Sequence, residues 1–421
     1  MRKLYGKKKF DWENGAKLED HSRRKHKILR EYFYQYIITR CQLPKQERFR
    51  LAIIDGFSGA GRYICGTAGS PIIFMEELNK ATKYINIQRA EQGLPLIEIE
   101  CFLILNDSEP IAVELLKENI YPLHAEIRDT NRQLHIKTHY MSNFFEQAYS
   151  EIKSLLRAGR YKSTIFNLDQ CGHSQVRNET LADIIRSNNS AEIFYTFAIE
   201  TLLAFLQKTN PKQLATQLSH LSINEYDIAQ LDTIMDKKSW LGTAERIVYS
   251  TFKKCAQFVS PFSINNPNGW RYWLIHLASF YRARQVYNNI LHINSGSQAH
   301  YGRSGLNMLA HDPSEEGKLY LFDSSARDDA KIQLLEDIPK LISSSGDAVR
   351  IEDFYSGIYN STPAHSDDIN IALIENPDIE IITESGGTRR KASQIKIDDT
   401  VRLKNQRSFF PIFLNNTNKK D

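Results

Sequence analysis

Two short segments carry the residues best suited to bind a nucleotide. In IIDGFSGAGRY, positions 53–63, an apolar run ends at Asp55 and is followed by Gly59 and Gly61. Glycine has no Cβ atom and accepts positive φ angles, so a ligand can approach the backbone closely at such a turn. A second apolar run ends at Asp107, and an acid at the tip of a second strand can bind both hydroxyls of a ribose. Together the segments predict a nucleotide-type site.

The spacing of these segments favours one cofactor over another. In dinucleotide-binding folds the loop has the pattern GxGxxG, and the acid follows about 20 residues later. Here the loop lacks that pattern and Asp107 comes much later in the chain, so NAD is disfavoured. We expect S-adenosylmethionine, whose adenosine and amino-acid ends need the same two strand tips. An ordinary strand-to-helix turn with a capping acid explains the same residues, and this alternative stays open.

The elements that must position these residues alternate along the chain. Residues 20–40 have the apolar spacing of an amphipathic helix with a basic first turn. Helical patterns then alternate with five predicted strands, at positions 49–54, 97–107, 134–140, 163–169 and 191–199. Strands that alternate with helices in this way are typical of a doubly wound parallel sheet, and the predicted class is therefore α/β with a Rossmann-type core.

The order of elements suggests four parts of the chain. The last part has two helical patterns and then two strands around Gly386-Gly387, which is the order of a winged helix. The predicted parts are a basic N-terminal helical segment (1–45), a Rossmann-like core (46–200), a helical elaboration with one or two late strands (201–345) and a winged-helix-like C-terminal module (346–421).

Composition excludes several classes of protein. The 421 residues are 41% hydrophobic and 25% charged, with a net charge of +4, which is typical of a globular chain. Because neither a membrane span nor a secretory signal peptide is recognisable, we expect a cytoplasmic protein without membrane contact. The five cysteines lack the close pairs of a zinc site, so no metal is expected. A two-metal nuclease is also disfavoured, since no Asp/Glu cluster with lysine is evident.

Charge is distributed unevenly along the chain. Residues 1–50 contain 15 Lys and Arg against 6 Asp and Glu. Such a basic segment favours an anionic partner such as nucleic acid, although a solvated basic arm would have the same composition.

Several segments together resemble one protein family. The sequence blocks HSRRKHKILREYF, DGFSGAGRY, GTAGSP, DQCG and WLIHLASFYRARQVYNNIL are similar to the three-Cys-motif partner (TcmP) family, which has a class I methyltransferase-like fold. The resemblance covers most of residues 10–340. It extends more distantly to DNA methyltransferases, whose first motif also has the pattern D-x-F-x-G-x-G. It implies a phage or mobile-element setting, in the context of phage defence, and a partner protein with a three-cysteine motif.

The resemblance also implies roles for residues on the first three strands. The methionine and adenosine side of a cofactor pocket would be lined by Asp55, Phe57, Gly59 and Gly61. Asp107 or Glu109 would hold the ribose. Asn143 stands where methyltransferases usually have an Asp for the adenine amino group, and its carbonyl oxygen can still accept that hydrogen bond.

The fourth strand ends in the segment that would face the substrate. Amino-methyltransferases have a polar residue, two prolines and an aromatic residue there, whereas this chain has Asp169-Gln170-Cys171-Gly172. Asp169 is the candidate catalytic residue, because it can accept a proton or orient a target amine. A nucleophilic role for Cys171 is a weaker alternative. His26 is a second candidate catalytic residue at the pocket rim, unless its helix turn simply faces solvent.

Candidate nucleic-acid contacts are spread over three segments. They are Lys25 on the first helix, Arg282 and Arg284 after a late strand, and the hairpin residues Arg389, Arg390 and Lys391. Residues 349–421 contain 10 Lys and Arg against 11 Asp and Glu, so a protein-contact role for the module is an equal alternative. The sequence therefore predicts an S-adenosylmethionine-dependent methyltransferase-like protein that acts on or docks to nucleic acid. The alternative is an inactive methyltransferase-fold subunit that binds nucleic acid or a partner.

Overall fold

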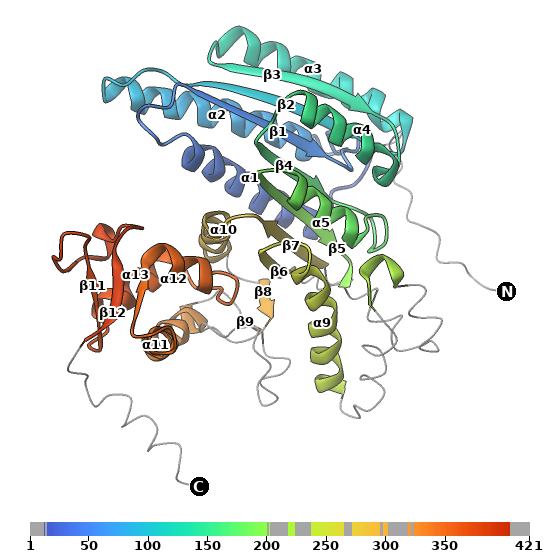
Figure 1. Cartoon of the computed structure of the whole chain (residues 1–421). Helices are drawn as coiled ribbons and strands as arrows, with labels where there is room; N and C mark the ends of the chain where they lie inside the picture. The colour runs from blue at the N-terminus through green and yellow to red at the C-terminus, as the bar shows by residue number, and fades with distance from the viewer. Residues whose placement is uncertain are drawn as a thin grey trace. The chain divides into compact units, whose positions relative to one another are not determined.

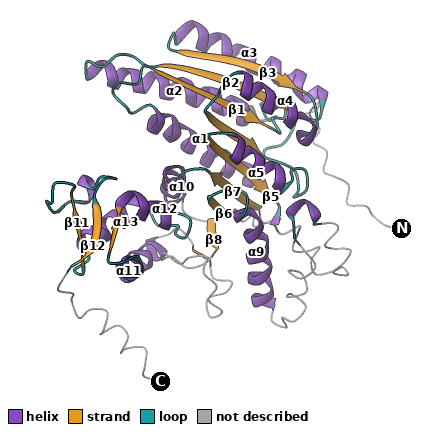
Figure 2. Cartoon of the chain, in the orientation of Figure 1, coloured by secondary structure: helices purple, strands orange, loops and turns teal. Residues whose placement is uncertain are grey.

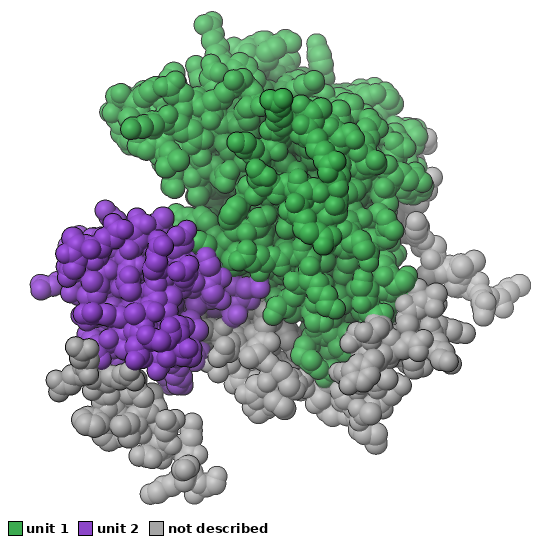
Figure 3. Space-filling view, viewed as in Figure 1, with its two compact units in different colours: residues 1–286 green, residues 287–421 purple. Residues whose placement is uncertain are grey.

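The chain divides into two compact units, residues 1–286 and residues 287–421 (Figure 3). The computed structural model in Figure 1 describes residues 12, 15–199, 202, 218–223, 237–264, 272–294, 298–301, 319–320 and 324–404. Much of the basic stretch before residue 15, and large parts of the predicted helical elaboration, lie outside these residues. Among the described helices, none combines the length and the apolar character needed to cross a membrane.

The first unit is built on a mostly parallel sheet. Its seven strands lie in the order β3-β2-β1-β4-β5-β7-β6. Strand β7 is antiparallel to both of its neighbours, whereas the strands from β3 to β5 are mutually parallel. This strand order, with the reversed strand inserted beside β5, is that of the class I methyltransferase fold. The strands are β1 (Arg48–Asp55), β2 (Glu98–Asn106), β3 (Leu134–Met141), β4 (Ser163–Leu168), β5 (Ser190–Phe197), β6 (Phe258–Ile264) and β7 (Tyr272–Ala278).

Helices cover both faces of this sheet (Figure 2). The central strands are therefore buried on both sides, which explains why β1, β2 and β4 are nearly continuous apolar runs in the sequence. Helix α1 packs against α2, where the rings of Phe33 and Phe74 meet edge to face at 5.0 Å. The helices are α1 (Asp20–Arg40), α2 (Ser70–Glu91), α3 (Pro110–Thr130), α4 (Phe145–Ala158), α5 (Asn178–Ser187), the short η1 (Ser219–Leu221), α9 (Lys237–Lys253) and α10 (Tyr281–Ile293), the last of which continues into the second unit.

The second unit contains a winged-helix-like arrangement. Its elements follow one another as helix, strand, helix, helix, strand, strand, and the strands form an antiparallel sheet in the order β10-β12-β11. The segment 349–360, expected to be one helix, begins with a short strand. The elements are α11 (Ser324–Ser344), β10 (Ala348–Arg350), α12 (Ile351–Ile358), α13 (Ser366–Glu375), β11 (Ile379–Ile382), η3 (Ala392–Gln394) and β12 (Thr400–Leu403). A short antiparallel pair, β8 (Gln298–Tyr301) and β9 (Leu319–Tyr320), precedes them and continues the order of the large sheet after β6.

Candidate functional site

The loop after β1 begins at a fully buried carboxyl group. Asp55 ends the strand and is 0% exposed. Burial raises the pKa of Asp55 to about 7, although hydrogen bonds from Ser70, Asn167 and the Phe57 N–H oppose this rise. The Phe57 N–H lies 3.3 Å from an Asp55 carboxylate oxygen. Asp55 therefore holds the start of the loop from within the core.

The ends of β1 and β2 meet at Asp107. One carboxylate oxygen of Asp107 accepts a hydrogen bond from the Gly59 N–H at 2.9 Å, and the other accepts one from the Glu109 N–H, also at 2.9 Å. The side chain is only half-buried, so the oxygens also border solvent. Burial raises the pKa of Asp107, and these backbone donors oppose the rise. The glycine loop and the acid, far apart in the sequence, are thus in direct contact.

The two glycines of the loop have neighbours that a Cβ atom would strike. Gly59 has a φ of +57°, and a Cβ there would lie 2.5 Å from Cη2 of the Trp12 indole. Gly61 has a φ of +75°, and a Cβ there would lie 2.7 Å from Cδ1 of Leu116 on α3. Both positions therefore require glycine for backbone conformation and for packing. The sequence pattern of the loop predicts that a ligand contacts these glycines and contains no sign of the contact with Trp12.

One asparagine that the sequence reasoning missed joins three strand ends. Asn106, the last residue of β2, is 1% exposed. Its Nδ2 donates to the carbonyl oxygens of Gly56 (3.0 Å) and Asn143 (2.9 Å), and its Oδ1 accepts from the Asn143 N–H (3.2 Å). The Asn143 side chain remains exposed. The candidate cofactor residues on β1, β2 and β3 are thus brought to one edge of the sheet.

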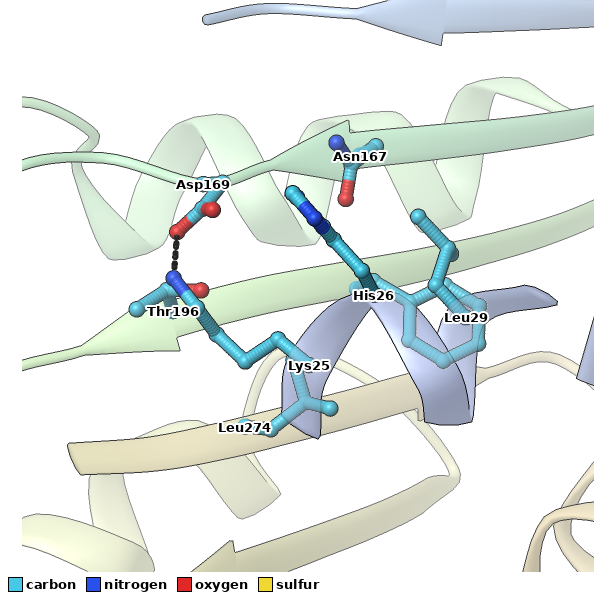
Figure 4. Close-up of a pocket in the computed structure, with 8 residues that line it drawn as sticks. Lys25, His26, Leu29, Asn167, Asp169, Thr196 and Leu274 are labelled. Carbon is cyan, nitrogen blue, oxygen red and sulfur yellow. Dashed lines mark hydrogen bonds and ion pairs between the residues drawn. The ribbon is translucent and has the colours of Figure 1, made fainter. Parts of the chain in front are cut away.

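A small pocket at the neighbouring strand ends contains both candidate catalytic residues (Figure 4). The Lys25 ammonium lies 2.5 Å from Oδ1 of Asp169, and His26 points toward the space between Asp169 and Asn167. Helix α1 supplies the cationic side and β4 the carboxylate side. The pocket is lined by Lys25, His26, Leu29, Asn167, Asp169, Phe194, Thr196 and Leu274.

Electrostatics fix the protonation states in this pocket. Burial alone would raise the pKa of Asp169, but the charge of Lys25 and hydrogen bonds from Lys25 and Thr196 outweigh it and lower that pKa. Burial lowers the pKa of His26 to about 4, although the Asp169 charge opposes this shift. At neutral pH Asp169 is therefore a carboxylate and His26 a neutral imidazole. The Nδ1 atom of His26 is buried and has no hydrogen-bond partner among the described residues.

Three of the expected nucleic-acid contacts are buried or paired within the protein. Lys25 is 6% exposed and is paired with Asp169. Arg284 is 0% exposed and lies in the core, so it cannot reach a phosphate. Arg389 donates to both carboxylate oxygens of Asp399, at 2.9 and 3.0 Å. Lys25 and Arg389 have internal partners and Arg284 is buried, whereas their assignment to a phosphate backbone stays a prediction.

The other three candidates lie on the surface. Arg282, Arg390 and Lys391 are exposed. Helices α12 and α13 contribute no further positive charge, because neither contains Lys or Arg. Their exposed acids are Glu352, Asp353, Asp367 and Glu375. A groove-binding role for α13 is therefore electrostatically unfavourable.

Cys171 and a nearby pair of histidines are the other reactive side chains after β4. Cys171 is exposed, forms no disulfide and lies two residues after Asp169. His173 Nδ1 lies 3.3 Å from His220 Nε2, and burial, with a smaller contribution from His220, lowers the pKa of His173 to about 4. In the part of the chain that the structure describes, no group of three or more His, Cys, Asp and Glu side chains could hold a metal ion.

The fold and the strand-end loops define an α/β protein with the class I methyltransferase topology. Comparison with known proteins adds no narrower assignment. No family model matches the sequence, and no curated protein matches it significantly. Membership of the TcmP family therefore stays a prediction.

Proposed function

We propose that this chain is an S-adenosylmethionine-dependent methyltransferase-like protein that acts on, or docks to, nucleic acid. The observation that carries the proposal is the contact between Gly59 and Asp107, which joins the glycine loop to the acid at the edge where methyltransferase-type sheets bind ligands. The phage or mobile-element setting, and a three-cysteine partner protein, belong to the same proposal and rest on the resemblance to TcmP.

The residues at this edge fit the adenosine part of the cofactor. The half-buried Asp107 carboxylate is available to accept from ribose hydroxyls, and the exposed Asn143 amide suits an adenine edge. A ligand that lies against Gly59 would also touch the Trp12 indole, which packs there. When bound, S-adenosylmethionine supplies an electrophilic methyl group.

The pocket residues would act on the group that receives the methyl. Asp169 is anionic at neutral pH and can accept a hydrogen bond from a target amine or hydroxyl. His26 is neutral, and its buried Nδ1 can accept a proton when it is the unprotonated nitrogen of the ring. Lys25 keeps Asp169 ionised, which makes the carboxylate an acceptor and not a proton donor.

Exposed cations support a nucleic-acid contact only in limited regions. Arg282, Arg390 and Lys391 remain candidates for phosphate contact, whereas the acidic surfaces of α12 and α13 argue against insertion of a helix into a groove. We therefore propose backbone contacts at the hairpin and in the basic first 50 residues, without base readout by α13.

A second candidate function is an inactive subunit with the same fold that binds nucleic acid or a partner protein. The observation in its favour is the Lys25–Asp169 ion pair. The Lys25 ammonium already donates to the Asp169 carboxylate oxygen that a target amine would need as its acceptor. The absence of the Pro-Pro segment after β4 is consistent with this alternative.

Calorimetric titration separates the two candidates. We expect S-adenosylhomocysteine and S-adenosylmethionine to bind the wild-type chain, and Asp107→Ala to weaken both. Asp129→Ala, at an exposed acid near the end of α3, is the matched control and should leave the affinity unchanged. No binding heat at millimolar ligand, together with no effect of Asp107→Ala on thermal stability in the presence of ligand, would exclude the enzymatic proposal.

A further inference from the structure

Asn106 occupies the central position among the three loops at the candidate ligand edge. It ends β2, which lies between β1 and β3 in the sheet. The backbone ladder between β2 and β3 pairs Asn106 with Met141 and is not continued beyond them. Past this point two backbone hydrogen bonds, from Ser58 N–H to Asn106 O and from Asp107 N–H to Met141 O, join the loops, and side-chain contacts add to them.

The side chain of Asn106 supplies these contacts. It donates to Gly56 O and Asn143 O and accepts from Asn143 N, as described above. Its own carbonyl oxygen accepts from the Ser58 N–H at 2.9 Å. One buried residue thus fixes the backbone at the start of the glycine loop and at Asn143. Neither a hydrophobic residue nor a carboxylate could make the same contacts, because both carbonyl partners require a donor.

We infer that Asn106 is a positioning residue for the ligand of this edge and that it acts through the backbone of Gly56 and Asn143. The inference rests on the proposed function, since it assumes that the edge binds the cofactor. Asn106 is too deeply buried to touch the ligand itself, at 1% exposure. Its effect is to hold the exposed Asn143 side chain at a constant distance from the glycine loop.

Asn86, on α2, provides a matched control, because its side chain binds the backbone at the opposite end of β2. Its Nδ2 donates to Ile97 O at 3.0 Å, and its Oδ1 accepts from Ile97 N at 2.7 Å. Asn86 is also buried, but it holds the chain that enters β2. Asn86→Asp therefore removes a comparable backbone contact without disturbing the carboxyl edge of the sheet.

The test measures the affinity for S-adenosylhomocysteine by calorimetry in the full-length chain. Asn106→Asp should weaken binding by about tenfold, because two donors to backbone carbonyls are lost, whereas Asn86→Asp should not change the affinity. Asn106→Ser, which keeps a short hydroxyl donor, serves as the second variant if Asn106→Asp does not fold.

A double-mutant cycle separates positioning from general destabilisation. Asn143→Ala should weaken binding about three- to tenfold in the wild-type chain, and much less in the Asn106→Asp chain, because Asn143 is no longer held in place. Provided that the wild-type chain binds the ligand, three results would each overturn the inference. The first is that the effects of Asn106→Asp and Asn143→Ala on the affinity are additive. The others are an equal loss of affinity in Asn86→Asp and Asn106→Asp, or an unchanged affinity in Asn106→Asp. A wild-type chain that binds no ligand would instead overturn the proposed function, and this inference with it.

Discussion

Replacement of Lys25 by methionine is the most informative perturbation of the pocket. Methionine keeps most of the length of the side chain but removes the charge 2.5 Å from Asp169. Removing one partner of a buried ion pair costs about 3–5 kcal/mol. Because the Asp169 side chain is 26% exposed, water offsets part of this cost, and we expect Lys25→Met to lower the free energy of unfolding by about 2–3 kcal/mol at pH 7.

The size of this effect should depend on pH. In the wild type the pKa of Asp169 is lowered, so the stability it contributes is present above the ordinary aspartate pKa, about 3.9, and is lost as pH falls through the folded-state value. Without Lys25, burial is no longer opposed by the ammonium, and the pKa of Asp169 rises. The variant then regains stability as acidification protonates Asp169. The difference between the two chains should therefore be largest near pH 7 and shrink toward pH 4.

Urea unfolding followed by tryptophan fluorescence measures this difference in the free energy of unfolding for the first unit. All four tryptophans, at positions 12, 240, 270 and 273, lie in residues 1–286, so their emission reports on the first unit. In an Asp169→Asn background, Lys25→Met should cost less than about 1 kcal/mol, because no buried carboxylate is left without its partner. Equal costs in both backgrounds, or a cost independent of pH, would refute the ion-pair argument.

Two pairs of substitutions test the glycine loop and the hairpin. Gly59→Ala should weaken S-adenosylhomocysteine binding and change the fluorescence of Trp12, whereas Gly66→Ala, which also has a positive φ but no atom near its Cβ, should cause strain without either effect. An unchanged affinity in Gly59→Ala would place the ligand elsewhere. Arg389→Ser should lower the melting temperature of the second unit in calorimetry and leave the salt dependence of nucleic-acid binding unchanged. Lys391→Ser should leave the melting temperature unchanged and flatten the salt dependence of nucleic-acid binding by about one unit of slope. A flatter slope in Arg389→Ser would contradict the internal pairing of Arg389.

The sheet could be predicted because its signal is local in sequence. The apolar runs of β1 and β2 each end in a polar residue, Asp55 and Asn106, and a helical pattern follows each run. Parallel strands buried on both faces have this appearance regardless of their neighbours. The predicted strand pattern also indicated that the candidate cofactor residues lie together at the carboxyl ends of the strands.

The roles of individual cations were not predictable in the same way. Arg282 and Arg284 are two positions apart on α10, so they face different sides of the helix, one toward solvent and the other into the core. The pairing of Lys25 with Asp169, and the packing of Trp12 on Gly59, depend on tertiary contacts that no local pattern records.

The sequence separation of the Lys25–Asp169 pair has a consequence for synthesis of the protein. The two residues are 144 positions apart. At an elongation rate of about 5–20 residues per second, Asp169 is made about 7–30 s after Lys25. During that interval α1 carries a solvent-exposed lysine at a position destined for burial, and β1 lacks its partner β4, which pairs with it in parallel. The pocket therefore forms only after a slow, non-local strand pairing, so a ribosome-bound chain that ends before β4 has the glycine loop but no pocket.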